Sequence, residues 1–304
     1  MHANRSRRQF QQAATQKACA KQDAMSFFNI LTSAELFDVV ESQLPAHRER
    51  LYHPTETLSM FLAQALRPDR SCQKAVNEAL VTRLLAGMKP CSAYTGGYCR
   101  ARQRLPIELV SSLVKTTGSL VNASIPSHWL HQNRSVYIVD GTTTTLPDTK
   151  RNQERYPQQH SQKAGLGFPI CRIVAATCLS SGAVIEAAMG AYKGKGASEH
   201  TLFRSILPSF ERGDMLIGDA LYGSYFILAE CLQRGIDVLF EQNGARKRRV
   251  DFRKGKKLGR EDHLICLKKP VQRPHWMSVD QYEAEPDELT IREVRVNGKV
   301  LITT

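Results

Sequence analysis

Two short apolar stretches that each run into an aspartate decide the fold: VYIVD at residues 136–140 and MLIGD at residues 215–219. Each stretch has the length and composition of a buried β-strand, and we expect each strand to end at its acid. A carboxylate in that position emerges from the edge of a packed core. If the two strands are neighbours, Asp140 and Asp219 can bind a divalent metal ion jointly.

The stretches around these strands predict an α/β sheet of mixed direction. Two apolar runs joined by Ser-Ser-Gly are typical of a hairpin, and Ser198 is placed to cap a helix. The predicted order is three strands, helix, strand, helix, strand, which we assign to one domain at residues 136–243. Its remaining elements are the hairpin strands 170–179 and 183–192, a helix at 224–234 and a strand at 237–240.

The flanks differ from this core. Residues 26–135 have helical spacing, with helices expected at 29–36, 57–66 and 72–85 and a stop at Gly87. Residues 1–25 form a basic tail for which we expect disorder. Residues 244–304 begin with a basic run and continue with β-like stretches at 263–267, 289–296 and 300–304, the last two joined by the tight-turn pair Asn297-Gly298.

Charge is concentrated in the flanks. The chain of 304 residues has a formal net charge of +13. Residues 1–135 hold 17 Lys and Arg against 9 Asp and Glu, and residues 244–304 hold 15 against 9. Residues 136–243 are nearly neutral, with 10 against 11. A neutral core between basic flanks is typical of an enzyme that acts on nucleic acid.

Several other function classes lack their sequence signatures. The Gly-Lys-Gly at 194–196 is not a P-loop, and neither a histidine metal motif nor a G-x-S-x-G nucleophile elbow occurs. The eight cysteines show no zinc-like spacing, which favours a reduced, cytoplasmic setting. We expect no signal peptide and no membrane span.

Spacing alone leaves two interpretations of the aspartates open. They bind metal, or each merely ends a strand and begins a turn. Their surroundings favour the first, because four segments in the same order resemble the DDE-class insertion-sequence transposases, specifically the insertion sequence 4 family. The segments are YCRARQRLP at 98–106, DGTT at 140–143, GFP at 167–169 and GDALYGSY at 218–225, and the likeness spans residues 30–304.

The resemblance implies an RNase H-like catalytic domain, a helical N-terminal domain that grips the ends of the mobile element, and a β-rich insertion near the C-terminus. Such proteins cleave bacterial DNA at the element's termini and join the ends to a target. The implied cofactor is Mg²⁺, with two ions expected and Mn²⁺ as a substitute. Asp140 and Asp219 would be metal ligands, and a homodimer on double-stranded DNA at the nucleoid is implied. Ala220 stands where many relatives carry arginine.

One family feature has no counterpart in the sequence. The third acid of the family is a glutamate in a Tyr-x-x-Arg-x-x-x-Glu pattern, which is absent, so we expect a truncated insertion that ends at Thr304. Glu199 is interpreted as a first-turn helix acid, and Glu241 as the best substitute. Two alternatives stay open: a remnant that only binds DNA, and an RNase H-like nuclease with a different third acid. The in-chain candidates are Glu199, Glu241, Glu261, Glu288 and Glu293.

Basic side chains in both flanks are candidates for contact with DNA phosphates. In the helical flank they are Arg100, Arg102 and Arg104, whose alternate spacing prevents all three from sharing one helix face. In the C-terminal flank they are Arg246, Lys247, Arg248, Arg249, Arg253, Lys254, Lys256 and Lys257. The alternative for this run is a solvated loop. Trp276 is interpreted as a core residue, with stacking on an unpaired base as the alternative.

Overall fold

The computed structural model describes residues 40, 42–44, 51–159, 161, 163, 165–194, 197–247 and 250–304. The chain forms two compact units, residues 1–116 and 117–304, and each is described separately. The sequence predictions for residues 1–25 and 29–36 lie outside the described residues. No helix in the described part of the chain is long and apolar enough to cross a membrane.

The first unit is helical, as predicted. Ser71 caps the helix Cys72–Leu85 by accepting a hydrogen bond from the Lys74 amide at 3.3 Å, and Gly87 follows that helix at a φ of 70°. Tyr98 is fully buried in a small core between the helices. The helices are α4 (Pro54–Leu66), α5 (Cys72–Leu85), α6 (Gly96–Arg104) and α7 (Ile107–Ala123), whose last residues belong to the second unit.

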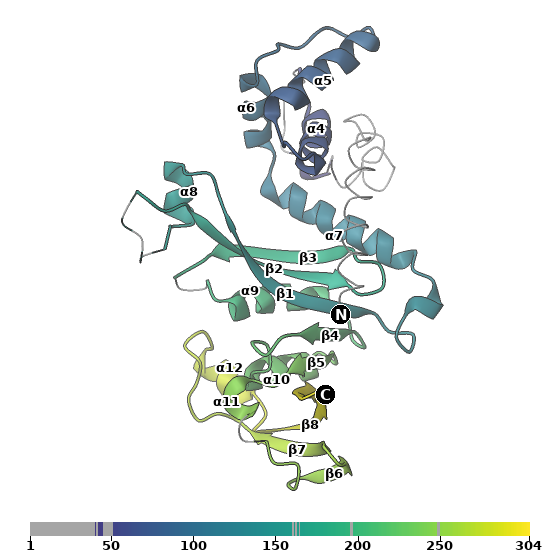
Figure 1. Cartoon of the computed structure of the whole chain (residues 1–304), viewed down its shortest axis with the longest axis vertical. Helices are drawn as coiled ribbons and strands as arrows, with labels where there is room; N and C mark the ends of the chain where they lie inside the picture. Colours follow the sequence, from purple (N-terminus) through teal and green to yellow (C-terminus); the bar gives the residue numbers. More distant parts are fainter. Residues whose placement is uncertain are drawn as a thin grey trace. The chain divides into compact units, whose positions relative to one another are not determined.

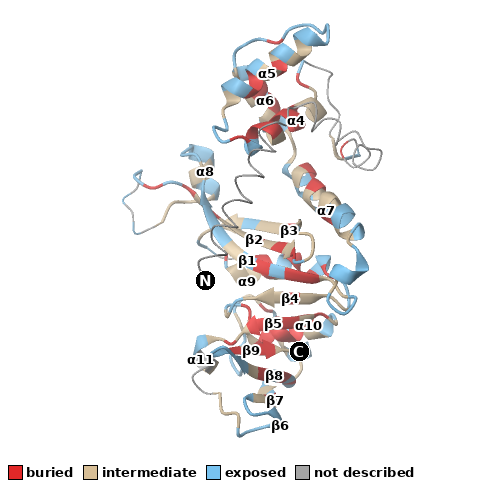
Figure 2. Cartoon of the chain, turned by 45° about the vertical axis from the view of Figure 1, so that its right-hand side comes forward, coloured by how far each residue is buried: buried red, intermediate tan, exposed pale blue. Residues whose placement is uncertain are grey.

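The second unit is built on one nine-stranded sheet of order β3-β2-β1-β4-β5-β9-β8-β7-β6; Figure 1 shows the run of strands from β3 to β6, and Figure 2 labels β9 between β5 and β8. The strands are β1 (Val136–Thr145), β2 (Ile170–Cys178), β3 (Val184–Ala191), β4 (Met215–Gly218), β5 (Asp237–Glu241), β6 (Lys256–Gly259), β7 (Asp262–Lys268), β8 (Glu288–Val296) and β9 (Lys299–Thr303). The helical elements are η1 (Ser127–Trp129), α8 (Lys150–Arg155), α9 (Glu199–Ile206), η2 (Leu207–Ser209), α10 (Tyr225–Gln233), α11 (Gly244–Lys247) and α12 (Val279–Ala284).

The first five strands confirm the predicted fold class. β1, β2 and β3 form an antiparallel meander, whereas β4 and β5 run parallel to β1. Parallel neighbours need crossover connections, which α9 and α10 supply. Ser198 caps α9 as predicted, since its Oγ accepts a hydrogen bond from the Thr201 amide. A mixed sheet in the order 3-2-1-4-5 with β2 reversed is the RNase H-like arrangement.

The C-terminal strands continue the same sheet. β9 pairs antiparallel with β5, so that Phe240 lies opposite Ile302, and β8, β7 and β6 follow. The predicted tight turn joins β8 to β9: Asn297 and Gly298 have φ values of 49° and 77°, as a two-residue hairpin turn requires. The sequence did not predict that these strands would extend the sheet of the core.

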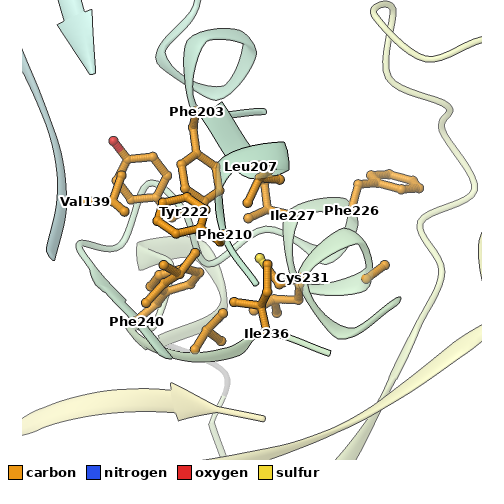
Figure 3. Close-up of a cluster of buried hydrophobic side chains, with 14 of the residues drawn as sticks. Val139, Phe203, Leu207, Phe210, Tyr222, Phe226, Ile227, Cys231, Ile236 and Phe240 are labelled. Carbon is orange, nitrogen blue, oxygen red and sulfur yellow. The ribbon is translucent and has the colours of Figure 1, made fainter. Parts of the chain in front are cut away.

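The main core lies between the sheet and the helices α9 and α10. Figure 2 shows buried residues gathered in β1, β5, β9 and α10. At its centre the fully buried ring of Tyr222 packs between Phe203 and Phe240, with ring centroids 4.8 and 5.9 Å away (Figure 3). Trp276 is half-buried and packs against the edge of this core, beside Phe226 and under the Arg204 guanidinium.

One strand boundary was predicted wrongly. The sequence led us to end the first strand at Asp140, but β1 continues through four threonines to Thr145. The cause is that β2 is long enough to pair with all of this extension, from Asp140 opposite Ala175 to Thr145 opposite Ile170, and threonine favours extended backbone. Asp140 therefore lies inside β1.

Candidate active site

The strand register brings Asp140 and Asp219 together. The parallel pairing of β1 with β4 ends with Ile138 opposite Ile217; Asp140 lies two residues further along β1, and Asp219 lies two residues further along the chain, directly after the end of β4. Parallel neighbours are about 4.8 Å apart where they pair, and the two acids come at corresponding positions just beyond the last pair, in one row across the sheet. Tyr137 and Val139 are buried in the core, whereas Asp140 and Asp219 are exposed.

A backbone amide fixes each carboxylate. The Gly141 amide donates to Asp140 Oδ1 at 2.8 Å, and the Leu221 amide donates to Asp219 Oδ1 at 2.8 Å. Within the described part of the chain, no hydrogen bond engages Oδ2 of either residue. Each carboxylate is thus oriented through one oxygen and presents the other for binding.

A third carboxylate approaches this row from the helix side. Glu199, the first residue of α9, is half-buried, and its carboxylate lies directly against Gly141. A Cβ at residue 141 would be 2.2 Å from Glu199 Cδ and 2.3 Å from Glu199 Oε1. The glycine after Asp140 is therefore required for the close approach of Glu199.

The glycine before Asp219 has a corresponding role. A Cβ at Gly218 would lie 2.8 Å from the ring of Tyr222, so the missing side chain admits that ring to the core. The Tyr222 hydroxyl then donates to Glu199 Oε1 at 2.7 Å. His200 Nε2 also contacts the Leu221 carbonyl oxygen at 2.6 Å. The first turn of α9 is thus tied to the loop that carries Asp219.

The electrostatics of Tyr222 agree with this geometry. Burial is the main cause that raises the pKa of the Tyr222 phenol far above its usual value, followed by the hydrogen bond to Glu199 and the charge of that carboxylate. The charges of Asp219 and Asp140 raise it further. The hydroxyl is therefore protonated at physiological pH and remains a hydrogen-bond donor to Glu199.

The other acidic candidates have different partners. Glu241 follows Phe240, the residue opposite Gly218, and so lies one strand from Asp219, but its carboxylate pairs with Lys299 Nζ at 2.8 Å. Glu293 on β8 is fully buried, where it accepts hydrogen bonds from Gln242 and Arg246 and contacts His263. The remaining two, Glu261 and Glu288, lie on or beside β6 and β8, with β9 and β5 between them and β4.

The basic run after β5 is partly engaged within the protein. Arg246 Nε donates to Glu293 at 2.9 Å, and Arg253 pairs with Asp251, which holds the pKa of that carboxyl at about 2. Lys256 and Lys257 are exposed on the edge strand β6, and Lys254 is exposed in the turn before it. Arg248 and Arg249 lie outside the described residues, as does the side chain of Lys247.

The three arginines of α6 do not share one helix face, as their alternate spacing predicted. Arg100 and Arg104 are exposed. Arg102 is half-buried: its guanidinium lies over the Phe61 ring at 4.9 Å and donates to Gln64 Oε1 at 3.2 Å. The Arg102 guanidinium therefore makes its contacts inside the helical unit.

Comparison with known proteins adds the family. The sequence model described as "Transposase DDE domain" matches residues 131–290, more than half of the chain and the whole region from β1 to the start of β8. The chain belongs to the transposase DDE domain family. No curated protein sequence gives a significant match to it.

A solved structure with some similarity is the piggyBac transposase synaptic complex with hairpin DNA, determined by cryo-electron microscopy. It shares 9% sequence identity with the chain at a TM-score of 0.39, and the match covers 94% of this chain and 62% of that one. The chain thus spans less than two thirds of the length of that transposase.

Transposase domains of the DDE family generally use divalent metal ions, and the donor set of this DDE domain fits such an ion. Mg²⁺ is held through one or two carboxylates, with water and substrate phosphates filling the other positions. Two amide-anchored carboxylates at corresponding positions would supply such ligands. Among the described residues, no three His, Cys, Asp or Glu side chains are close enough to hold a metal ion. The fit therefore rests on the aspartate pair.

Proposed function

We propose that the protein is the DNA transposase of a bacterial insertion sequence of the insertion sequence 4 family. It binds the element's ends and carries out metal-dependent phosphodiester cleavage and strand transfer. The observation that supports the proposal is the parallel register of β1 with β4, which gives Asp140 and Asp219 corresponding positions in a transposase DDE domain. Both side chains are exposed, so a DNA backbone can reach them.

Asp140 and Asp219 would hold Mg²⁺, or Mn²⁺ in its place, through the oxygens that the Gly141 and Leu221 amides do not engage. A pair of such ions activates the attacking oxygen and stabilises the leaving one in phosphoryl transfer. In the first step a water oxygen attacks phosphorus and the bond from phosphorus to the 3′ oxygen breaks; the attacking water loses a proton to solvent, and the 3′ oxygen takes one up from solvent to leave as a hydroxyl. In the second step the freed 3′-hydroxyl attacks a phosphodiester of the target in the same way.

Exposed basic side chains supply sequence-independent contacts to the DNA backbone in this proposal. In the helical unit these are Arg100 and Arg104, because Arg102 is engaged with Phe61 and Gln64. In the C-terminal region they are Lys254, Lys256 and Lys257, together with the neighbouring basic residues of the run. A homodimer on double-stranded DNA, in the bacterial cytoplasm, completes the proposal, since two element ends are processed together.

The reaction products distinguish the proposed transposase from two related functions. A DNA-binding remnant would bind DNA but cleave nothing, and an RNase H-like nuclease would cleave without joining strands. The family domain and the paired, exposed aspartates support the transposase over the remnant.

The experiment is a nicking and strand-transfer assay with supercoiled plasmid in Mg²⁺ or Mn²⁺. Wild-type protein is compared with Asp140→Asn and Asp219→Asn, each checked for an unchanged melting temperature. We expect metal-dependent nicking by the wild type and a loss of at least 100-fold in either variant, because each carboxylate contributes a metal ligand. Nicking that persists in both variants would refute the assigned site, and DNA binding without any cleavage would support the remnant.

A further inference from the structure

Beyond Asp140, β1 presents a row of exposed hydroxyls on the face that carries this aspartate. Side chains alternate between the two faces of a strand, and the pairing of β1 with β2 continues without a bulge. Val139 lies in the core, so Asp140, Thr142 and Thr144 share the opposite face. Both threonines are exposed. Within the described part of the chain, the Thr142 hydroxyl has no hydrogen-bond partner, and that of Thr144 contacts only the Thr145 carbonyl oxygen, at 3.5 Å.

The row leads toward α8, which is basic. Figure 1 shows α8 at the far end of β1, away from β4. The helix holds three Lys and Arg against one acid, Glu154, and Lys150, Arg151 and Arg155 are all exposed. None of these three cations pairs with a carboxylate among the residues that the structure describes. Their charge is therefore available to an external anion.

Arg155 connects α8 to the face of the threonine row. Cys171 lies opposite Thr144 in β2 and shares its face, and its thiol is fully buried although it lies outside the main core. Burial raises the pKa of the Cys171 thiol, whereas a hydrogen bond with the Gly190 backbone and the charge of Arg155 oppose that rise. The positive charge of α8 thus reaches the face that carries Asp140.

Two glutamines fix the position of α8. Gln153 Nε2 donates to the Gly167 carbonyl oxygen at 2.9 Å, and Gln153 Oε1 accepts from the Gln158 amide at 3.2 Å. Gln158 Oε1 in turn accepts from the Gly167 amide at 3.1 Å. The Leu146 amide also donates to the Pro169 carbonyl oxygen at 2.9 Å, which closes the segment at the end of the strands. The basic side chains therefore start from fixed backbone positions, which lowers the entropic cost of binding.

We propose that Thr142, Thr144 and the basic residues of α8 form a track that binds the DNA backbone and leads it to Asp140. The inference rests on the proposed function, since it assigns a DNA-binding surface to the same catalytic domain. Lys and Arg, together with hydroxyl side chains, are the usual partners of DNA phosphates, and such contacts set the position of a protein on the duplex. Although residues 136–243 are nearly neutral in total, the track gives them a local site for a polyanion.

The competing occupant is a second copy of the chain. Leu166 and Phe168, in the segment after α8, are exposed, and the centre of a protein interface is apolar and poor in charge. The row itself is of the opposite kind, because it consists of hydroxyls followed by unpaired cations. Charge complementarity therefore favours DNA.

The test compares two double variants of one strand. Thr142→Val with Thr144→Val removes the hydroxyls on the Asp140 face, whereas Thr143→Val with Thr145→Val removes those on the other face. Valine keeps the shape and the strand preference of threonine, so both variants should retain the wild-type melting temperature. Affinity for a fluorescent DNA duplex is measured by anisotropy in EDTA, where no cleavage occurs. We expect a loss of about tenfold in the first variant, from two hydrogen bonds to phosphate, and of less than twofold in the second.

A third variant tests the basic part of the track. Lys150→Ala with Arg151→Ala should lower the slope of log K against log salt concentration by between about 1 and 2, because each cation that contacts a phosphate contributes about 0.9. The Thr142 and Thr144 variant should keep the wild-type slope, since a hydroxyl carries no charge. The mass of each variant in solution is measured by light scattering at the same time.

The outcomes separate this inference from the proposed function. Equal DNA affinity in the two threonine variants would overturn the track, while metal-dependent nicking that is lost in Asp140→Asn would leave the proposed function intact. A smaller mass of the Lys150 and Arg151 variant, at unchanged DNA affinity, would assign the surface to a second copy of the chain and would also overturn the track. If the wild type binds no DNA, the proposed function fails, and the track fails with it.

Discussion

Gly141 and Glu199 are in direct contact: a Cβ added to residue 141 would lie 2.2 Å from the carboxylate carbon of Glu199. The two residues belong to β1 and to the crossover helix α9, so their contact fixes the start of that helix beside the strand that carries Asp140. Four consequences of the structure can be measured.

Gly141→Ala should displace Glu199 and, because the Gly141 amide orients the Asp140 carboxylate, should impair catalysis more than folding. The glutamate side chain can move aside, so the main loss is its hydrogen bond to Tyr222, a cost of about 1 kcal/mol in unfolding free energy. Urea denaturation and plasmid nicking measure the two effects. The control is Gly244→Ala, where an added Cβ meets no atom within 4 Å. Equal nicking by both variants would show that the contact is irrelevant to activity.

Alkaline titration should reveal buried phenols. Burial is the leading cause that raises the pKa of Tyr98 and Tyr225 to about 12, and that of Tyr137 and Tyr222 above its usual value of about 10. Because the unfolded chain loses these protons first, stability is fully present below pH 10 and falls as pH rises above it. Absorbance at 295 nm should therefore show these tyrosines ionising together with unfolding. Ionisation at pH 10 in folded protein would contradict the burial.

Glu293→Leu should destabilise the C-terminal half of the sheet. Glu293 is fully buried and receives hydrogen bonds from Gln242 and Arg246 beside His263. Removing it leaves these groups unpaired, which costs about 3 kcal/mol for a buried ion pair. Glu288→Leu, on the same strand but exposed, should change the unfolding free energy by less than about 0.5 kcal/mol. Similar urea midpoints for the two variants would refute the importance of the buried cluster.

Salt dependence should identify the phosphate contacts. Each lysine that contacts a DNA phosphate contributes about 0.9 to the slope of log K against log salt concentration. The double variant Lys256→Ala with Lys257→Ala is expected to lower that slope by between about 1 and 2. Arg292→Ala serves as the control, because Asp262 neutralises that guanidinium through two hydrogen bonds. An unchanged slope in the lysine variant would remove β6 from the DNA interface.

Much of the fold could be predicted from local patterns. Apolar runs identified β4 and β5. The Ser-Ser-Gly and Asn-Gly turn sequences identified two hairpins, and Ser198 identified the start of α9. The end of β1 was missed because threonines after Asp140 resemble a turn until a long partner strand pairs with them. The pairing of β9 with β5 was missed because strand neighbours distant in sequence leave no local signal.

In the candidate site, too, the sequence identified local features but not contacts between distant segments. Asp140 and Asp219 were identified because each follows a buried strand, which is a local feature. Glu199 was correctly placed in the first turn of a helix, but its contact with Gly141 depends on how that helix packs across the sheet. The available signal was the pair of glycines beside the aspartates, since each marks a close approach by another group. Sequence alone does not say which group approaches.

The most direct test of the central claim is the anomalous X-ray scattering of crystals of the protein soaked in Mn²⁺. The account predicts manganese density beside Asp140 and Asp219, and no such density in crystals of Asp140→Asn. Density bound elsewhere, or none at this pair of aspartates in well-ordered wild-type crystals at millimolar Mn²⁺, would contradict the assignment of the active site.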